Sequence, residues 1–101
     1  MILVYITASS VVEARSIGMT LVKEKLAACV NILPKMNSIY RWKNKIESAN
    51  EVVLIVKTRN ANYKKIEKRV KELHSYDLPC VIKLDITAGS KAYLKWIESE
   101  S

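Results

Sequence analysis

The sequence predicts an α+β fold in which two strand–helix–strand units form one antiparallel sheet and a final helix follows. Three observations predict it. Stretches rich in β-branched residues alternate with stretches whose apolar residues recur at helical spacing. Half of the 101 residues are hydrophobic, which suits one domain, over residues 1–101, with a single core. Two glycines and two prolines leave no room for an interdomain linker.

The first unit begins with residues 1–8 (MILVYITA), an apolar β-branched run that predicts a strand covered on at least one face. Ser10 is the expected N-cap of the next helix, because Glu13 follows at the spacing of a capping box. Apolar residues then repeat at helical intervals to about Lys25. Gly18 lies on that apolar face, where it allows the helix to approach the sheet closely.

A long, bent hairpin is expected next, from about residue 28 to residue 58. Residues 28–33 (ACVNIL) return to strand character, and Pro34 interrupts it. Asn44 is the turn candidate. Residues 51–58 (EVVLIVKT) form the strongest predicted strand, a nearly continuous β-branched run of the buried kind.

The second unit is predicted to start with a helix over about residues 61–73, capped by Asn60, with an apolar stripe on one side and lysines on the other. Residues 74–79 (HSYDLP) form a loop, since the residue before a proline avoids helical geometry. Residues 80–86 follow as the fourth strand, and residues 91–98 as a short terminal helix.

This element order, βαββαβ plus a C-terminal helix, defines a ferredoxin-like sandwich with both main helices on one face of the sheet. The strands are apolar on both faces, most clearly over residues 52–56. A second layer must therefore cover the other face. In so short a chain we expect self-association to supply it.

Composition argues against several functions. The net charge of +7 is concentrated between residues 57 and 71, which a solvated helix face explains. The alternative is specific RNA binding. RNA-binding proteins of this fold stack bases on aromatic residues of the central strands, and residues 52–56 contain no aromatic residue. The longest apolar runs hold about six residues, whereas a membrane helix needs roughly 20. We expect no membrane or nucleic-acid partner. No phosphate-binding loop or hydrolase motif is present, so we expect no enzyme.

The two cysteines, Cys29 and Cys80, lie in apolar, strand-like stretches. No Cys-x-x-Cys pair or Cys/His cluster is present, which argues against a structural zinc site. We expect both to be reduced thiols in a cytoplasmic protein, with Cys80 packed in the core.

Short motifs spread over nearly the whole chain resemble one family. They are LAACVN at 26–31, SIYRW at 38–42 with KIE at 45–47, KT at 57–58, HSYDLP at 74–79 and YLKWI at 93–97. In this order and spacing they resemble the CutA1 divalent-cation tolerance proteins. The resemblance implies a tight, cytosolic homotrimer that binds copper or other divalent ions. The same fold and trimer resemble PII signalling proteins, which implies, as the alternative, a small ligand held between subunits.

The resemblance also points to metal ligands. Copper ligands of some family members are a cysteine in the first strand and two adjacent histidines, and here these positions hold Ile6, Leu73 and His74. His74 is a candidate ligand, although a helix-terminal histidine also commonly bonds the last carbonyl groups. Cys29 is the second candidate, as a soft ligand for copper, with simple packing as the alternative.

A candidate ligand-binding cleft draws on the other motifs. Tyr40 and Trp42 point to one side of a strand, where they serve as packing residues between subunits or as a cleft wall. A small anionic ligand near Lys57 would fit the PII-like alternative.

Three more charged or polar residues complete the candidate cleft. Glu47 belongs to the same hairpin as Lys57, and the two form either a ligand-binding couple or a structural salt bridge. Tyr76 and Asp77 lie in the loop before the fourth strand, where function and a simple Asx turn are both common.

Overall fold

The computed structural model describes all 101 residues and places four strands in one sheet with the order β2-β3-β1-β4, each strand antiparallel to its neighbour. Its elements are β1 (Ile2–Ala8), α1 (Val11–Lys23), β2 (Cys29–Trp42), β3 (Lys45–Thr58), the 3-10 helix η1 (Asn60–Asn62), α2 (Tyr63–Leu73), β4 (Val81–Asp85) and α3 (Lys91–Glu100). The predicted ferredoxin-like sandwich with a long hairpin and a terminal helix is confirmed.

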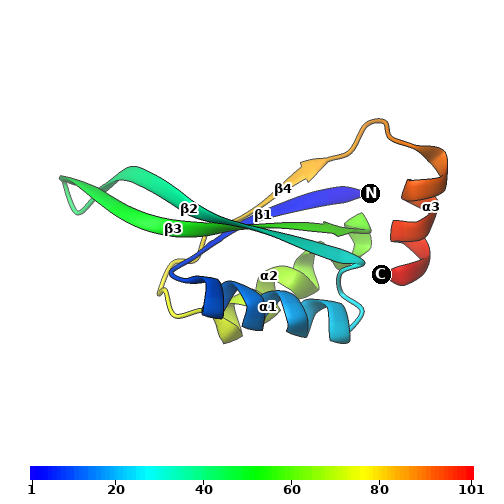
Figure 1. Ribbon diagram of the computed structural model, residues 1–101, viewed down its shortest axis with the longest axis horizontal. Helices are drawn as coiled ribbons and strands as arrows, with labels where there is room; N and C mark the ends of the chain where they lie inside the picture. The colour runs from blue at the N-terminus through cyan, green and yellow to red at the C-terminus, as the bar shows by residue number, and fades with distance from the viewer.

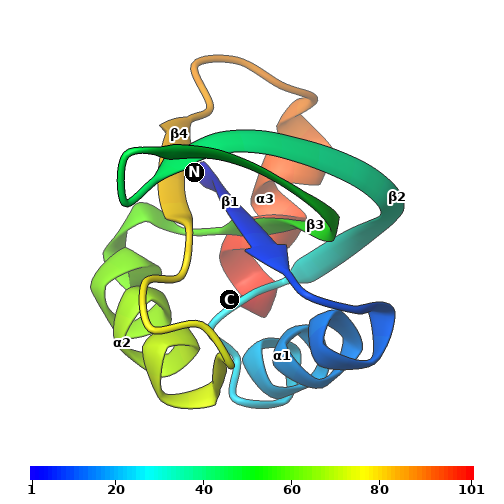
Figure 2. The same ribbon diagram turned by 90° about the vertical axis from the view of Figure 1, so that its left-hand side faces the viewer.

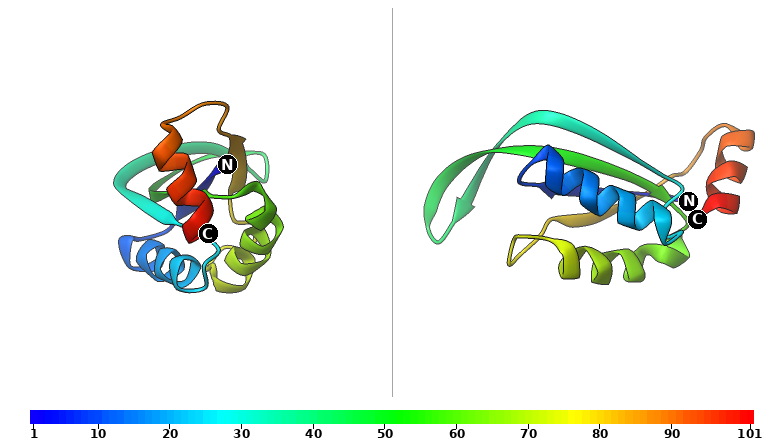
Figure 3. Two further views of the ribbon diagram at one scale, coloured as in Figure 1. Left: turned by 90° about the vertical axis from the view of Figure 1, so that its right-hand side faces the viewer. Right: turned by 60° about the horizontal axis from the view of Figure 1, so that its bottom comes forward.

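The core lies between the sheet and one helical layer. Figures 1 and 3 show α1 and α2 side by side beneath the same face of the sheet. Alternate residues of the two central strands point into this layer, among them Val4 of β1 and Leu54 of β3, which are completely buried. Ile66 and Val70, on the predicted apolar stripe of α2, are also completely buried. Burial of these side chains is the main force that holds the helices on the sheet.

The start of α1 and its contact with the sheet follow the sequence closely. Ser10 is the N-cap, and its Oγ accepts a hydrogen bond from the backbone N–H of Glu13 at 3.1 Å. Gly18 faces the sheet at such close range that an added Cβ would lie 3.2 Å from Cγ1 of Val30. The absence of a side chain at position 18 is therefore what permits this spacing.

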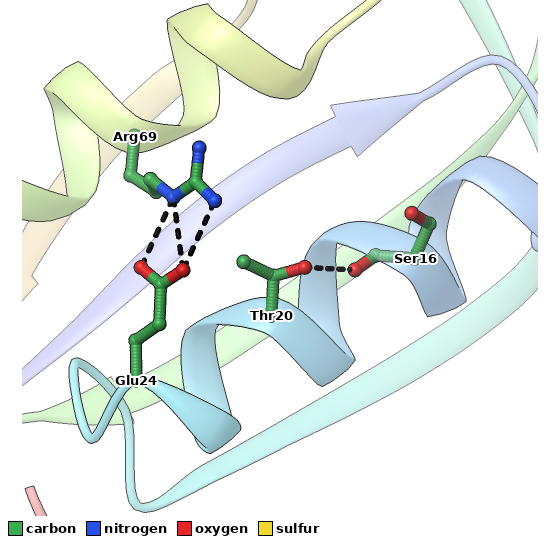
Figure 4. A network of polar contacts seen from close by, with 4 residues as sticks. All are labelled: Ser16, Thr20, Glu24 and Arg69. Atoms are coloured by element: carbon green, nitrogen blue, oxygen red, sulfur yellow. Dashed lines mark hydrogen bonds and ion pairs between the residues drawn. The ribbon is translucent and has the colours of Figure 1, made fainter.

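The far end of α1 is tied to α2 by an ion pair (Figure 4). Both carboxylate oxygens of Glu24 accept hydrogen bonds from the guanidinium of Arg69, at 3.0 to 3.2 Å. One turn earlier in α1, the Thr20 hydroxyl donates to the carbonyl oxygen of Ser16 at 2.9 Å. The forked geometry of the ion pair fixes how the two helices lie against each other at this end.

The hairpin of β2 and β3 extends from Cys29 to Thr58, which confirms the long, bent hairpin that the sequence predicts. Its turn is formed by Lys43 and Asn44, whose φ angles of 48° and 63° are those of a tight type I′ turn. The interruption predicted at Pro34 is a bulge: the register shifts between Leu33 and Met36, Lys35 has a φ of 64°, and the ribbon bends there. Figure 2 views the resulting curve from the side of the hairpin tip.

The predicted cap of the second helix is wrong. Asn60 begins η1 rather than α2, and its Oδ1 accepts a hydrogen bond from Nζ of Lys83 at 2.8 Å. Asn62 precedes α2 and makes no side-chain capping bond. Its buried amide instead donates to Oγ1 of Thr58 at 3.1 Å, and the Thr58 hydroxyl donates to the carbonyl oxygen of Leu26 at 2.6 Å. The Asn62 side chain therefore belongs to a buried polar network with Thr58 and Leu26 and does not cap α2.

The second face of the sheet is only partly covered. α3 packs across the end of the sheet opposite the hairpin tip (Figures 1 and 3). Elsewhere on this face Leu33, Ile82 and Leu84 remain about half exposed.

No helix combines the length and the apolar composition that crossing a bilayer requires.

Candidate functional site

A cavity of about 370 Å³ opens where the loop between α2 and β4 approaches the hairpin. Four predicted site residues line it, namely Tyr40 and Trp42 of β2 and Tyr76 and Asp77 of the loop. Tyr40 and Trp42 are two residues apart, so both point to the same side of the strand. The two sequence motifs that carry these residues, over 30 residues apart, therefore meet at one place.

The cavity also contains residues that sequence reasoning did not select. Glu51 of β3 accepts a hydrogen bond from the Tyr76 hydroxyl at 2.9 Å. Burial, followed by this hydrogen bond and the negative charge of Glu51, raises the pKa of Tyr76 to about 12. Thr7 and Leu78 complete the polar and apolar parts of the wall. The one sequence signal that could have identified Glu51 is its place directly before the most apolar stretch of the chain, Val52–Val56.

Cys80 lines the same cavity, which corrects its assignment to the core. The side chain is half-buried and lies outside the main core cluster, because β4 begins only at the next residue. Burial, and next the charge of Glu51, raises the pKa of the Cys80 thiol. The sulfur is therefore a neutral thiol at neutral pH rather than a thiolate.

His74 positions the loop with both of its ring nitrogens. Nε2 lies 2.6 Å from the carbonyl oxygen of Thr7, and Nδ1 accepts a hydrogen bond from the backbone N–H of Tyr76 at 3.1 Å. A carbonyl oxygen only accepts, so Nε2 carries the proton and the imidazole is neutral. The His74 ring also lies 4.6 Å from the Tyr76 ring, centroid to centroid. Neither nitrogen has a free lone pair for a metal ion.

Glu13 is the second anchor of this loop. Its carboxylate accepts hydrogen bonds from the backbone N–H groups of Ser9 and Ser75, both at 2.9 Å. Burial raises the pKa of Glu13, but the hydrogen bonds from Ser9 and Ser75 outweigh burial and lower the pKa to about 2. The first turn of α1 is thereby joined to the loop that carries Tyr76.

Lys57 and Glu47 do not form the expected charged pair within the chain. Lys57 lies opposite Cys29 in the β2–β3 register, whereas Glu47 lies opposite Tyr40. Ten residues of strand separate them, about 33 Å at 3.3 Å per residue. Nζ of Lys57 instead donates to the hydroxyl of Tyr93 at 3.1 Å and lies 5.3 Å from the centre of its ring. Neither residue lines the cavity, so the prediction that Lys57 and Glu47 belong to the cleft is wrong for the single chain.

The two predicted metal ligands lie in different parts of the chain. Cys29 starts β2 at the level of Leu3, whereas His74 contacts Thr7, four residues further along β1 and across the sheet. No group of three or more histidine, cysteine, aspartate or glutamate side chains is suitably placed to hold a metal ion. At the other two positions that the family resemblance pointed to, Ile6 is fully buried and Leu73 packs against the core, and neither side chain is a metal ligand. A single chain therefore does not contain the expected site.

The fold and cavity define a class of protein: a small ferredoxin-like protein with a projecting hairpin, a partly uncovered sheet face and a cavity between the hairpin and the loop that follows α2. The family follows from comparison with known proteins. The model of the CutA1 divalent ion tolerance protein family matches residues 2–100. The chain belongs to this family.

Individual relatives agree. The divalent-cation tolerance protein CutA of Archaeoglobus fulgidus is 45% identical over 95 residues, which are 94% of this chain and 92% of the relative. Protein CutA, chloroplastic, of Arabidopsis thaliana is 41% identical over 99% of this chain, which spans only 55% of that relative. The solved structure of the divalent cation tolerance protein (Cut A1) from Thermus thermophilus superimposes with a TM-score of 0.97 at 42% identity, covering 100% of this chain and 99% of the other.

Proposed function

We propose that this protein is a cytoplasmic homotrimer that contributes to divalent-cation tolerance by binding copper or another divalent ion at sites formed between its chains. The observation that carries the proposal is the family match over residues 2–100, whose description is divalent ion tolerance. The only histidine of the chain, His74, bonds the backbone through both ring nitrogens, so it is not placed to act as a catalytic acid or base.

The trimer is supported by apolar surface that a single copy leaves open to water. On the second sheet face Ile82 and Leu84 are 55% and 51% exposed, and on the hairpin Ile39 and Ile46 are 75% and 73% exposed. β2 and β4 are both edge strands with unpaired backbone groups. Packing of copies against these surfaces would bury the apolar side chains and pair the edges.

The oligomeric state is directly measurable. Light scattering coupled to size exclusion at micromolar concentration is expected to give three times the chain mass of 11.5 kDa. Ile82→Lys is expected to dissociate the assembly, and Lys65→Glu, on the exposed face of α2, serves as the control. A folded wild-type monomer would contradict the proposal.

For metal binding between chains, Cys29 is the better of the two candidate ligands. Its sulfur, 4.0 Å from Oδ1 of Asn31, makes only a weak contact, and thiolate suits copper. His74 would bind copper only after releasing the N–H of Tyr76 from Nδ1.

Copper titration of the wild type, Cys29→Ser and His74→Gln tests this assignment. We expect Cys29→Ser to weaken binding more than His74→Gln, with Cys80→Ser as the matched control. Equal affinity in all four proteins would remove Cys29 and His74 from the site, and a wild-type protein that binds no divalent ion would refute the metal proposal itself.

The PII-like alternative, with an anionic ligand near Lys57, is not favoured. Lys57 lies away from the cavity that Tyr40, Trp42 and Tyr76 share, and is engaged by Tyr93. The cavity is lined by carboxylates, Glu51 and Asp77, and by no basic residue. Such a wall repels an anion.

A further inference from the structure

We propose that the cavity between the hairpin and the loop of residues 74–79 is a binding site for a small organic cation, an alkylammonium compound of aromatic-cage type. This function is separate from binding of a metal ion, and it follows from the charge, the aromatic walls and the size of the cavity.

The first argument is charge. Glu51 and Asp77 line the cavity, and neither takes part in an ion pair within the chain, whose ion pairs are Lys64–Glu67 and Arg69–Glu24. Lysine, arginine and histidine are all absent from the wall. The wall of the cavity is therefore negative, although the chain as a whole carries a net charge of +7. The Tyr76 hydroxyl occupies only one oxygen of Glu51, Oε2, so the other oxygen remains able to face a ligand.

The second argument is the chemistry of the walls. Tyr40, Trp42 and Tyr76 all contribute to the cavity, and Tyr40 and Trp42 are 43% and 45% exposed, so their rings are accessible to a ligand. The faces of aromatic rings attract cations, and ammonium groups with methyl or alkyl substituents gain apolar contact as well. A hydrated metal ion would gain little from such walls.

The third argument separates an ammonium compound from a soft metal ion. The only sulfur in the cavity belongs to Cys80, and its raised pKa keeps it as a thiol, whereas metal ligation requires the thiolate. A volume of about 370 Å³ is that of a small-molecule site and greatly exceeds what a single ion needs. Cavity size and sulfur chemistry therefore both favour an organic cation.

The experiment uses benzyltrimethylammonium as the probe, with benzyl alcohol and benzoate as the neutral and anionic controls. The chain contains two tryptophans, and Trp96 belongs to α3 at the end of the molecule opposite the hairpin (Figure 1). In a Trp96→Phe background Trp42 is therefore the only tryptophan and reports occupancy by fluorescence. We expect saturable binding of the ammonium probe, and binding of both controls at least about tenfold weaker.

Charge variants then assign the site. Glu51→Gln keeps an oxygen that accepts from Tyr76 but removes the charge, and is expected to weaken binding about tenfold. Asp77→Asn is the second variant, expected to act in the same direction. Glu98→Gln removes the same charge from α3 and is the matched control, with unchanged affinity. Calorimetry on the same proteins provides a readout that does not depend on Trp42.

Three outcomes would overturn the proposal. No saturable binding of the ammonium probe would mean that the cavity is closed, for example by a second copy of the chain. Equal binding of benzyl alcohol would mean that the cavity is merely apolar. Equal affinities in Glu51→Gln, Asp77→Asn and Glu98→Gln would place the probe elsewhere on the protein.

Discussion

Replacement of Glu13 by glutamine tests whether the loop of residues 74–79 is held by a carboxylate rather than by packing. In the folded chain the pKa of Glu13 is about 2, against an ordinary value of 4.5. A difference of about 2.5 corresponds to about 3.4 kcal/mol at 1.36 kcal/mol per pKa unit. The carboxylate is partly open to water, so solvent screening reduces the expected loss to about 1 to 2 kcal/mol.

The sign of the pH dependence follows from the lowered pKa. Glu13 binds its proton less readily in the folded chain than in the unfolded chain, so its contribution to stability is fully present above pH 4.5 and is lost as the pH falls towards about 2. Glu13→Gln lacks this titration. Its deficit relative to wild type should therefore be full at neutral pH and shrink towards about pH 2.

The assay is urea unfolding of wild type and Glu13→Gln at several pH values, at one chain concentration because assembly adds to apparent stability. Glu98→Gln, an exposed glutamate on α3, is the control and should follow the wild type throughout. A deficit that is the same at neutral pH and near pH 2 would refute the electrostatic explanation. Absence of any deficit would show that the contacts to Ser9 and Ser75 contribute nothing.

Three further changes have expected outcomes. Thr58→Val removes the buried donor to Leu26 and the acceptor of Asn62, and thermal or urea unfolding should show a loss of about 1 to 3 kcal/mol. Tyr76→Phe should lower the free energy of unfolding by about 1 kcal/mol, because it removes the hydrogen bond to Glu51. Ultraviolet difference spectroscopy of the wild type should show a tyrosine that titrates near pH 12, and this titration should be absent from Tyr76→Phe. Gly18→Val should destabilise by about 2 kcal/mol or more, because even an added Cβ would lie 3.2 Å from Val30; full stability would show that the helix moves away freely.

The fold was predictable because local and long-range signals agree. Each local signal predicts one element: the capping pair Ser10 and Glu13 the start of α1, the apolar stripe the helix α2, and the β-branched run the strand β3. Burial of the apolar faces of these elements favours the same sandwich. Pro34 interrupts the hairpin without ending it because a proline is tolerated at a bulge of an edge strand, and β2 is an edge strand.

The candidate site was predictable only in part. Tyr40, Trp42, Tyr76 and Asp77 were found because they belong to the family-like motifs SIYRW and HSYDLP. Aromatic residues that alternate along a strand, and polar residues in a loop before a strand, also occur often at binding sites. Pairing of Lys57 with Glu47 failed because membership of one hairpin says nothing about distance along it, and ten residues of strand span about 33 Å.

The roles of His74 and Glu13 explain why residue type alone misleads at this site. An isolated histidine suggests a ligand, yet His74 bonds the backbone on both sides, to Thr7 and to Tyr76. Glu13, which sequence assigns only to a helix cap, reaches the loop at Ser75. The cavity therefore depends on two residues that do not line it, because they fix the loop that places Tyr76 against Glu51. A variant at either anchor should alter ligand affinity through the position of Tyr76, even though no ligand atom touches it.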